Sequence, residues 1–298
     1  MTTRSLSYTS NGEGRPAGLP DTADVLRRAA GENFAVASRV LPASARRHLI
    51  AFYGYARLTD EIGDSYAGDR LAALDWLEGD VRAALDGRTG AHPLVAAATR
   101  SASELDMDPQ PLLDLVEANR LDQAVHDYAT FDQLQGCCTL SANPVGRMVL
   151  ASFGVTDPAR IELSDCICTG LQLVEHWQDV REDALAGRIY VPAVDRDRFG
   201  VEPADLRRPA PAGPNLRALM AFEVARARAW LDRGTPLLDG LPGRARLAVA
   251  GFVAGGHAAL DDIARRDFDV LRAPRRPRAR HVARRLLMTT SARRKPRP

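Results

Sequence analysis

The 298-residue sequence has little of what marks secreted, membrane-spanning or β-rich proteins. Its 4 cysteines are too few for a disulfide scaffold. The longest uncharged apolar stretch, residues 247–260, has 14 residues, whereas a membrane-spanning helix needs about 20. Residues 1–20 are polar and lack the apolar segment of a secretion signal. Strand-like alternation is nearly absent, with residues 188–191 as the one short candidate. We therefore expect a cytoplasmic protein without a spanning helix.

The net charge of +2 hides an uneven distribution along the chain. No acid follows Asp269, and residues 272–298 carry 11 cations, so that residues 1–271 hold 29 Lys and Arg against 38 Asp and Glu. The acidic body argues against nucleic-acid binding. A basic tail can hold a protein peripherally at the anionic inner face of a membrane. The alternative is a disordered, solvated tail without a partner.

The spacing of apolar residues predicts one large all-α domain over residues 21–272, between a flexible N-terminus (1–20) and the basic tail (273–298). Prolines early in two of the expected helices, Pro111 and Pro144, suit helix starts. Five prolines between residues 192 and 214 predict one long loop. The expected helices cover residues 44–65, 91–105, 111–125, 141–153, 161–186, 215–231 and 244–266.

The first chemical signal is an apolar helix face that ends in two acids. On a helix, Leu49, Tyr53, Ala56, Asp60 and Asp64 fall within about 80° of one another. A core-facing stripe should not end in unpaired carboxylates, and like charges four residues apart repel each other. A multivalent cation between the two acids would remove both problems. The alternative is that the helix frays before the acids, which are then solvated.

A second helix presents a similar polar stripe. Gln172, Glu175, Asp179 and Asp183 cluster within about 80° on one face, with no Lys or Arg between them on that face. The alternative is an ordinary acidic face in solvent. If the two stripes face each other, they form an oxygen-lined site suited to Mg²⁺, which binds a few carboxylates and completes its shell with water and substrate phosphates. This arrangement predicts chemistry on a diphosphate ester.

Four segments in the same order resemble the squalene/phytoene synthase family of head-to-head prenyl-condensing enzymes, over residues 30–272. They are YGYARLTDEIGD (53–64), SANPVG (141–146), QLVEHWQDVRED continuing into GRIYVP (172–192), and LDDI with FDVL (260–271). Residues 32–38 and the Trp177-Gln178-Asp179 sequence are similar to one branch, the hydroxysqualene synthases of the bacterial hopanoid pathway.

The resemblance implies a single isoprenoid-synthase-type helical bundle with a central cavity. It also implies two aspartate-rich motifs that bind Mg²⁺ and diphosphate. Matched by position, the metal-binding and catalytic candidates are Asp60, Asp64, Asp179 and Asp183, with Glu175 as a further metal ligand. The diphosphate-binding candidates are Arg57, Arg188, Tyr190 and Gln172, and Tyr53 matches a tyrosine near the reacting groups.

Three positions depart from the family pattern. Glu61 replaces the second of two adjacent aspartates, Glu175 replaces a usual asparagine, and Gly136 replaces a tyrosine common in the middle motif. These departures support the alternative of a non-catalytic helical homologue. The resemblance to the branch implies Mg²⁺-dependent conversion of presqualene diphosphate and water to hydroxysqualene and diphosphate. The nearest rival is condensation of two farnesyl diphosphates to presqualene diphosphate, squalene or a carotenoid precursor.

Several other residue patterns have simpler explanations. The spacing of the cysteines does not match zinc knuckles, so buried reduced thiols are expected. No GxGxxG motif follows a strand, which argues against a nicotinamide or flavin site. His176 points away from the acidic stripe and reads as structural. Four aromatic residues either line a lipid cavity or belong to the core: Phe34, Phe52, Tyr53 and Trp177.

Overall fold

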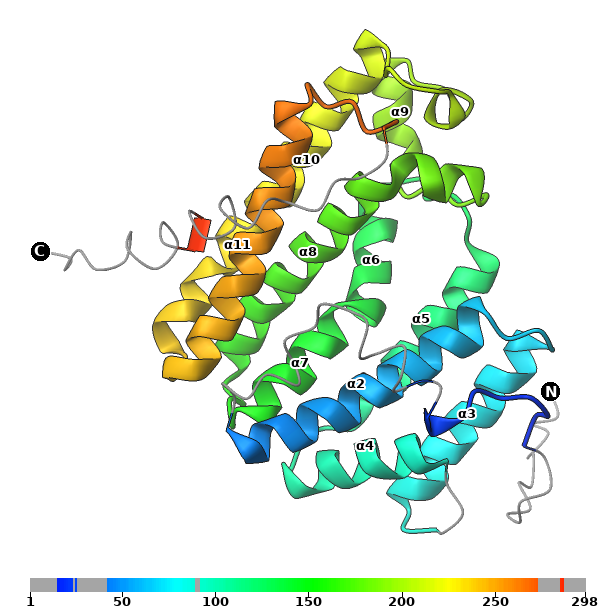
Figure 1. Ribbon diagram of the computed structural model, residues 1–298, viewed down its shortest axis with the longest axis vertical. Helices are drawn as coiled ribbons and strands as arrows, with labels where there is room; N and C mark the ends of the chain where they lie inside the picture. Colours follow the sequence, from blue (N-terminus) through cyan, green and yellow to red (C-terminus); the bar gives the residue numbers. More distant parts are fainter. Residues whose placement is uncertain (1–14, 24, 26–41, 89–91, 273–284, 287–298) are drawn as a thin grey trace, which may run out of the picture.

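The structure is a computed structural model that describes residues 15–23, 25, 42–88, 92–272 and 285–286. In this part of the chain the regular structure is helical, which confirms the predicted all-α fold (Figure 1). The α-helices are α2 (Ala43–Asp64), α3 (Arg70–Leu85), α4 (Pro93–Glu104), α5 (Gln110–Ala124), α6 (Phe131–Ser141), α7 (Asn143–Ser152), α8 (Pro158–Leu185), α9 (Ala193–Phe199), α10 (Pro214–Gly234) and α11 (Gly243–Arg265). Two 3₁₀ helices, η2 (Asp205–Arg207) and η3 (Thr235–Gly240), complete the set.

Seven predicted helices are present, and α3, α6 and α9 were not predicted. The prolines at 111 and 144 do lie in the first turns of α5 and α7. The prediction of one long loop over residues 192–214 is wrong, because α9 and η2 lie inside it. Here proline flanks a helix instead of interrupting one: Pro192 precedes the first residue of α9, and Gly200 ends the helix in a left-handed conformation at φ 63°. The predicted strand at 188–191 is only an isolated parallel bridge between Asp127 and Ile189.

Two hydrophobic cores organise the helices. The first is built by α2, α3, α4 and α5, with Met148 from α7, and the second by α6, α8, α10, α11 and the segments between them. Trp177 of α8 is fully buried in the second core, where its indole N–H donates to the carbonyl of Glu223 at 3.1 Å. Helix α7 contacts α2 and α5 on one side and α6 and α8 on the other, and so joins the two cores.

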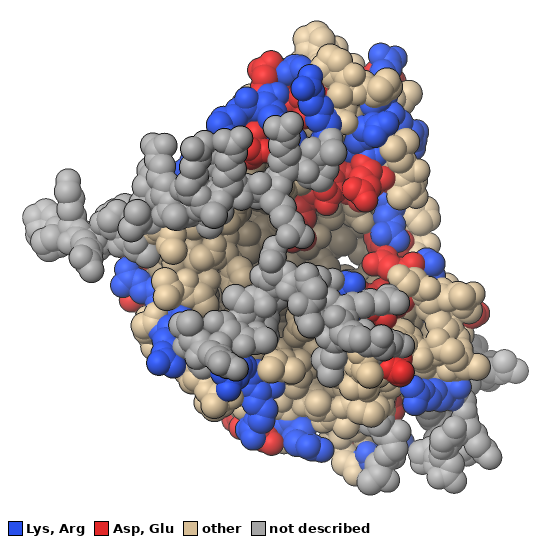
Figure 2. Space-filling model, viewed as in Figure 1, with Lys and Arg blue, Asp and Glu red and all other residues tan. Residues whose placement is uncertain are grey.

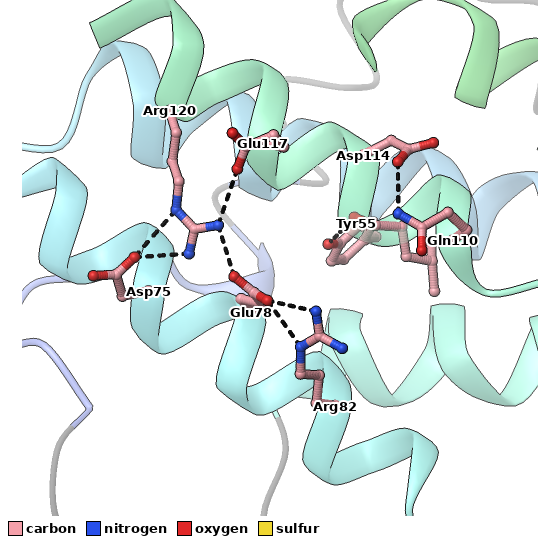
Figure 3. Close-up of polar contacts among 9 residues, drawn as sticks. Tyr55, Asp75, Glu78, Arg82, Gln110, Asp114, Glu117 and Arg120 are labelled. Atoms are coloured by element: carbon pink, nitrogen blue, oxygen red, sulfur yellow. Dashed lines mark hydrogen bonds and ion pairs between the residues drawn. The ribbon is translucent and has the colours of Figure 1, made fainter. Parts of the chain in front are cut away.

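Ion pairs and a buried hydrogen bond fix α5 against its neighbours in the first core (Figure 3). Arg120 of α5 reaches Asp75 at 2.7 Å and Glu78 at 2.6 Å, both on α3. Tyr55 of α2 is fully buried and donates to the carbonyl of Leu112 on α5 at 2.7 Å. These contacts fix the orientation of α5, and with it the residues that α5 presents on its other faces.

Helix α11 is, by length and composition alone, apolar enough to cross a membrane, which the shorter uncharged stretch in the sequence did not predict. In the structure 56% of its most apolar window is buried. Helix α11 packs against α8 and α10, and Val253, Ala254 and Leu260 are fully buried. A core helix of this kind accounts for its hydropathy.

The two ends of the chain are described in part. Leu19 lies in the first core, although residues 1–20 were predicted to be flexible. Residues 32–38, including Phe34, lie outside the described residues, as does most of the basic tail with its predicted membrane contact. Two tail residues are described: Arg285 binds Asp261 of α11 through two hydrogen bonds of 2.6 and 2.5 Å, and Leu286 packs against the second core.

Candidate active site

A cavity of about 730 Å³ lies between the two cores. Residues from α2, α5, α6, α7, α8 and α11 line it, together with the segment that follows α8. Figure 2 shows acidic side chains gathered along the edge of a hollow in this face of the molecule. The cavity is therefore polar and acidic in one part, while most of its wall is apolar.

Helix α2 contributes both predicted acids of the first motif. It continues through Asp64, and the N–H of Ser65 still donates to the carbonyl of Glu61 at 3.0 Å, so the helix does not fray before the acids. Asp60 and Asp64 both line the cavity. Asn119 of α5 lies beside them, with its amide nitrogen 3.5 Å from Asp60. The predicted stripe therefore faces the cavity as expected from the helical spacing.

Helix α8 contributes part of the second motif. Gln172 and Glu175 line the main cavity, whereas Asp183 lines a small recess beside it and Asp179 lines neither. Glu175 has exposed surface because its side chain faces the hollow, yet protein surrounds it. Burial, with repulsion from Asp179 and Asp60, raises the pKa of Glu175 to about 7. Asp60 of α2 and Glu175 of α8 line the same cavity, so the two motifs meet there.

The pKa values of the two other acids of the second motif are also raised. Burial and the charge of Asp179 raise the pKa of Asp183 to about 7, against an opposing effect of Arg188. Burial, followed by Glu182, raises the pKa of Asp179. Burial and mutual repulsion thus disfavour the charged forms of these acids, an effect that a bound cation would offset.

The segment after α8 brings a cation to this end of the cavity. Gly187 adopts φ 91°, a left-handed conformation that glycine adopts readily, and turns the chain back toward α5. Arg188 then lies 3.3 Å from Asp64 and 3.0 Å from Asp122 of α5. Tyr190 donates its hydroxyl to Asp122 at 3.2 Å. Arg57, Arg188 and Tyr190, which the sequence suggested as diphosphate contacts, all line the cavity.

The apolar wall of the cavity is large. Phe52 and Tyr53 line it, so two of the four aromatic residues singled out in the sequence face the cavity, while Trp177 belongs to the core. The thiols of Cys137 and Cys168 also reach the cavity wall. All four cysteines are free; Cys137 and Cys138 are buried, whereas Cys166 and Cys168 are only half-buried. The wall further contains Leu49, Val145, Val149, Leu171, Val249 and Phe252.

The chain is similar in sequence to known proteins. The sequence model of the family described as squalene/phytoene synthase matches residues 27–284. The chain belongs to the squalene/phytoene synthase family. It is 36% identical over 185 residues to a hydroxysqualene synthase of Zymomonas mobilis, a match that covers 59% of this chain and 60% of that protein. A hydroxysqualene synthase of Rhodopseudomonas palustris is 33% identical over 69% of this chain and 70% of its own length.

Solved structures of family members share the fold. The squalene synthase HpnC of Alicyclobacillus acidocaldarius superimposes with a TM-score of 0.77 at 39% identity, covering 84% of this chain and 95% of that one. A dehydrosqualene synthase superimposes with a TM-score of 0.80 over 91% of this chain and 96% of its own, but at 21% identity it shows the fold alone. The predicted isoprenoid-synthase-type bundle is therefore confirmed.

The squalene/phytoene synthase family uses a divalent metal, and the donors in this chain fit one. Among the described residues no three acidic, His or Cys side chains converge into a ready coordination shell. The candidate donors that line the cavity are nevertheless carboxylate and amide oxygens, and burial together with neighbouring acids raises the pKa values of Glu175 and Asp183. A hard divalent cation that keeps several waters and takes oxygens from a substrate phosphate matches such a loose donor set.

The departures from the family pattern differ in their surroundings. Glu61 is buried and is not part of the cavity wall, and its carboxylate lies 3.8 Å from Arg57. Glu175 lies in the cavity itself. A Cβ atom at Gly136 would meet nothing within 4 Å, so the position has room for a larger side chain. Of the three departures, only that at Glu175 alters the charge of the cavity wall.

Two polar cavity residues were missed in the sequence, and a third has more contacts than expected. Asn119 and Asp122 of α5 carry no motif, and only their spacing of three residues hints at a shared helix face. His176, predicted to be structural, stacks on Tyr190 and lies 3.3 Å from the Gln172 amide, and it also lines the cavity. Burial lowers the pKa of His176 to about 3, so its imidazole is neutral.

Proposed function

We propose that this chain converts presqualene diphosphate and water into hydroxysqualene and diphosphate, with Mg²⁺ as the divalent metal. The observation that carries the proposal is a single cavity with carboxylates from α2 and α8 at one end and an extensive apolar wall elsewhere. A polyisoprenoid diphosphate has the same division between a charged head and a long apolar tail. The names of the relatives, hydroxysqualene synthases from two organisms, support the choice within the family.

The residues of the chain have distinct roles in this reaction. Bound Mg²⁺ would neutralise the charge that develops on the departing diphosphate. Asp60, Asp64 and Glu175 would hold it, with Asp179 and Asp183 as neighbouring acids. Arg57 and Arg188 donate hydrogen bonds to diphosphate oxygens, with Tyr190 and Gln172 as further donors. The carbon–oxygen bond breaks with its electron pair on the diphosphate, water supplies the hydroxyl, and the water proton leaves with the diphosphate.

The apolar wall protects the carbocation that this bond cleavage creates. Phe52 and Tyr53 lie on the wall next to the acidic end, where their ring faces can stabilise positive charge. The alkyl side chains around them exclude bulk water, which restricts quenching to water admitted at the reacting carbon. The branch point between hydroxylation and other fates of the cation lies in this part of the cavity.

The rival within the family is condensation of two farnesyl diphosphates. It draws support from a phytoene synthase of Arthrospira platensis that is 28% identical over 86% of this chain and 88% of its own length. Product analysis by mass spectrometry, with presqualene diphosphate and farnesyl diphosphate supplied separately, decides between them. We expect hydroxysqualene from presqualene diphosphate and no product from farnesyl diphosphate alone. A C30 or C40 hydrocarbon or presqualene diphosphate formed from prenyl diphosphates would favour the rival, and no product from either would favour the non-catalytic homologue.

The metal requirement is tested in the same assay. Asp60→Asn and Asp179→Asn should each lower diphosphate release about 100-fold or more while the protein stays folded, because each removes a full negative charge from the metal-binding end. Asp114→Asn, on the outer part of α5, serves as the control and should retain wild-type rates. Full activity in EDTA, or near-normal rates in both variants, would contradict the proposed metal dependence.

A further inference from the structure

Asp122 of α5 lies at the acidic end of the cavity, next to the segment that follows α8. Its side chain lines the cavity and is only 20% exposed. Its two carboxylate oxygens serve two partners: Oδ1 accepts from the Tyr190 hydroxyl at 3.2 Å, and Oδ2 lies 3.0 Å from Arg188 Nη2. Both partners come from the segment after α8, which is far from α5 in sequence. Asp122 therefore connects the first core to the diphosphate-contact candidates.

The backbone of this segment is already fixed by other bonds. The N–H of Ile189 donates to the carbonyl of His126 at 2.8 Å, and the N–H of Ala193 donates to that of Tyr128 at 2.8 Å. The N–H of Arg188 donates to the carbonyl of Asp183 at 2.8 Å. These bonds place the Cα atoms of Arg188 and Tyr190, and the stack on His176 holds the Tyr190 ring. The direction of the long Arg188 side chain needs a separate determinant.

We propose that Asp122 is a positioning residue that orients the Arg188 guanidinium and the Tyr190 hydroxyl toward a bound diphosphate. The inference rests on the proposed function, in which Arg188 contacts diphosphate oxygens. Asp122 acts through its two partners and does not itself bind the anion, because a carboxylate next to a diphosphate would repel it.

The alternative partners of Arg188 explain why a dedicated carboxylate is needed. Arg188 also lies 3.3 Å from Asp64, and its charge lowers the pKa of Asp183 against the burial that raises it. Asp64 is a proposed metal ligand, and Asp183 is a neighbouring acid. Without Asp122, the guanidinium would move toward one of these acids, where it would compete with the metal and turn away from the diphosphate. Asp122 holds Arg188 between the metal-binding acids and the anion.

Inorganic pyrophosphate provides a probe that does not require turnover. We would measure its affinity for the full chain at saturating Mg²⁺ by calorimetry, for Asp122→Asn, Arg188→Ala and the double variant. Asparagine keeps the size of the side chain and an oxygen that accepts from Tyr190, but it loses the charge that holds Arg188. We expect Asp122→Asn to weaken binding about 10-fold, the effect of one charge-assisted contact, with an unchanged melting temperature.

The double variant separates positioning from a general structural effect. Because Asp122 acts mainly through Arg188, Asp122→Asn should add little once Arg188→Ala is present. In steady-state assays Asp122→Asn should raise KM for presqualene diphosphate more than it lowers kcat. Asp122→Glu, which restores the charge, should bind pyrophosphate more tightly than Asp122→Asn. Asp114→Asn, on the same helix and away from the cavity, is the matched control and should match wild type.

Three results would contradict the inference, and a fourth would contradict part of the proposed function. Wild-type affinity in Asp122→Asn together with weakened binding in Arg188→Ala would leave Arg188 as a diphosphate contact and exclude the positioning role. Full additivity of the two losses would show that Asp122 does not act through Arg188. A lowered melting temperature that accounts for the loss would reduce Asp122 to a structural residue. Wild-type affinity in Arg188→Ala would instead remove Arg188 from the proposed diphosphate site.

Discussion

The imidazole of His176 and the phenol ring of Tyr190 lie face to face, with centroids 3.8 Å apart and planes 16° from parallel. His176 comes from α8, and Tyr190 from the segment that folds back along it. The hydroxyl of Tyr190 reaches Asp122, which in turn lies beside Arg188. One continuous set of contacts therefore runs from α8 through the returning segment to α5 and ends at the cation of the acidic end.

The stacking at His176 predicts a difference between two substitutions. His176→Phe keeps a flat ring against Tyr190 and loses only the contact with Gln172, because the native imidazole is neutral. We expect this variant to stay within about 1–2 kcal/mol of wild type in unfolding free energy. His176→Ala removes the ring and should cost about 3 kcal/mol, with weaker substrate binding as Tyr190 loses its support. Chemical denaturation and KM measurements test both; equal effects of Phe and Ala would exclude a stacking role.

The close packing at Gly63, in the first motif, predicts that a larger side chain there would disturb the site. A Cβ atom there would lie 2.0 Å from Oδ1 and 2.8 Å from Cγ of Asn119. The absence of a side chain thus lets α5 approach α2 closely enough for Asn119 to lie beside Asp60. Gly63→Ala should displace Asn119 and destabilise the fold by about 1–3 kcal/mol.

A double-mutant cycle tests the cause of this loss. Asn119→Ala removes the atoms in closest conflict, so Gly63→Ala should cost less in that background than in the wild type. Unfolding free energies of the four proteins give the coupling directly. Strict additivity would mean that the glycine is required for another reason, such as the bond from Gln123 to its carbonyl.

Helical periodicity was enough to predict the part of the site that lies on a single helix. Asp60 and Asp64 face the cavity because the spacing of α2 fixes which side they share with its apolar stripe. The same reasoning was incomplete on α8, where Gln172 and Asp183 are separated by about 16 Å of helix, more than the main cavity covers. Asp122 could not be predicted, because its role depends on a segment more than sixty residues away. The surroundings of His176 likewise arise only when Tyr190 folds back over it.

Glu223 predicts a pH dependence of stability. The residue is fully buried, and its carboxylate shares Arg226 with Asp195, so one cation serves two acids. Burial, opposed by Arg226, raises the pKa of Glu223 from 4.5 to about 8. Because the folded chain binds this proton more tightly than the unfolded chain, its stabilising effect is complete at low pH and is lost as the pH rises toward about 8.

Glu223→Gln isolates this contribution, because glutamine stays neutral at every pH. We expect the variant to lie within about 1 kcal/mol of wild type at pH 6 and to gain stability relative to wild type between pH 6 and 9. Glu182→Gln, on the exposed surface of α8, is the control and should show no such trend. A relative stability of Glu223→Gln that stays constant or falls with rising pH would show that Glu223 is ionised in the folded protein.

The contact between Arg285 and Asp261 predicts that a short part of the basic tail stabilises the body. The pair is about three-quarters buried, Arg228 shares the carboxylate at 3.0 Å, and Leu286 packs on the second core. A chain ending at Arg284 should lose about 1–2 kcal/mol relative to one ending at Leu286, which corresponds to a melting temperature lower by a few degrees. Because Arg228 pairs with Asp261 in both chains, Asp261→Asn should cost more stability in the longer chain than in the shorter one. Equal melting temperatures of the two truncated chains would exclude the contact as a stabilising feature.

Glu175 predicts opposite effects in the absence and presence of metal. Without metal, Glu175 is repelled by Asp179 and Asp60, so Glu175→Gln should raise the melting temperature measured in EDTA. With metal, the same substitution removes a carboxylate ligand, so the Mg²⁺ concentration for half-maximal stabilisation and for half-maximal diphosphate release should rise about 10-fold. Glu162→Gln, on the exposed face of the same helix and outside the cavity, should change neither measurement. A raised melting temperature with an unchanged Mg²⁺ midpoint would make Glu175 a repelled wall residue, and an unchanged value of both would place its charge outside the metal-binding end.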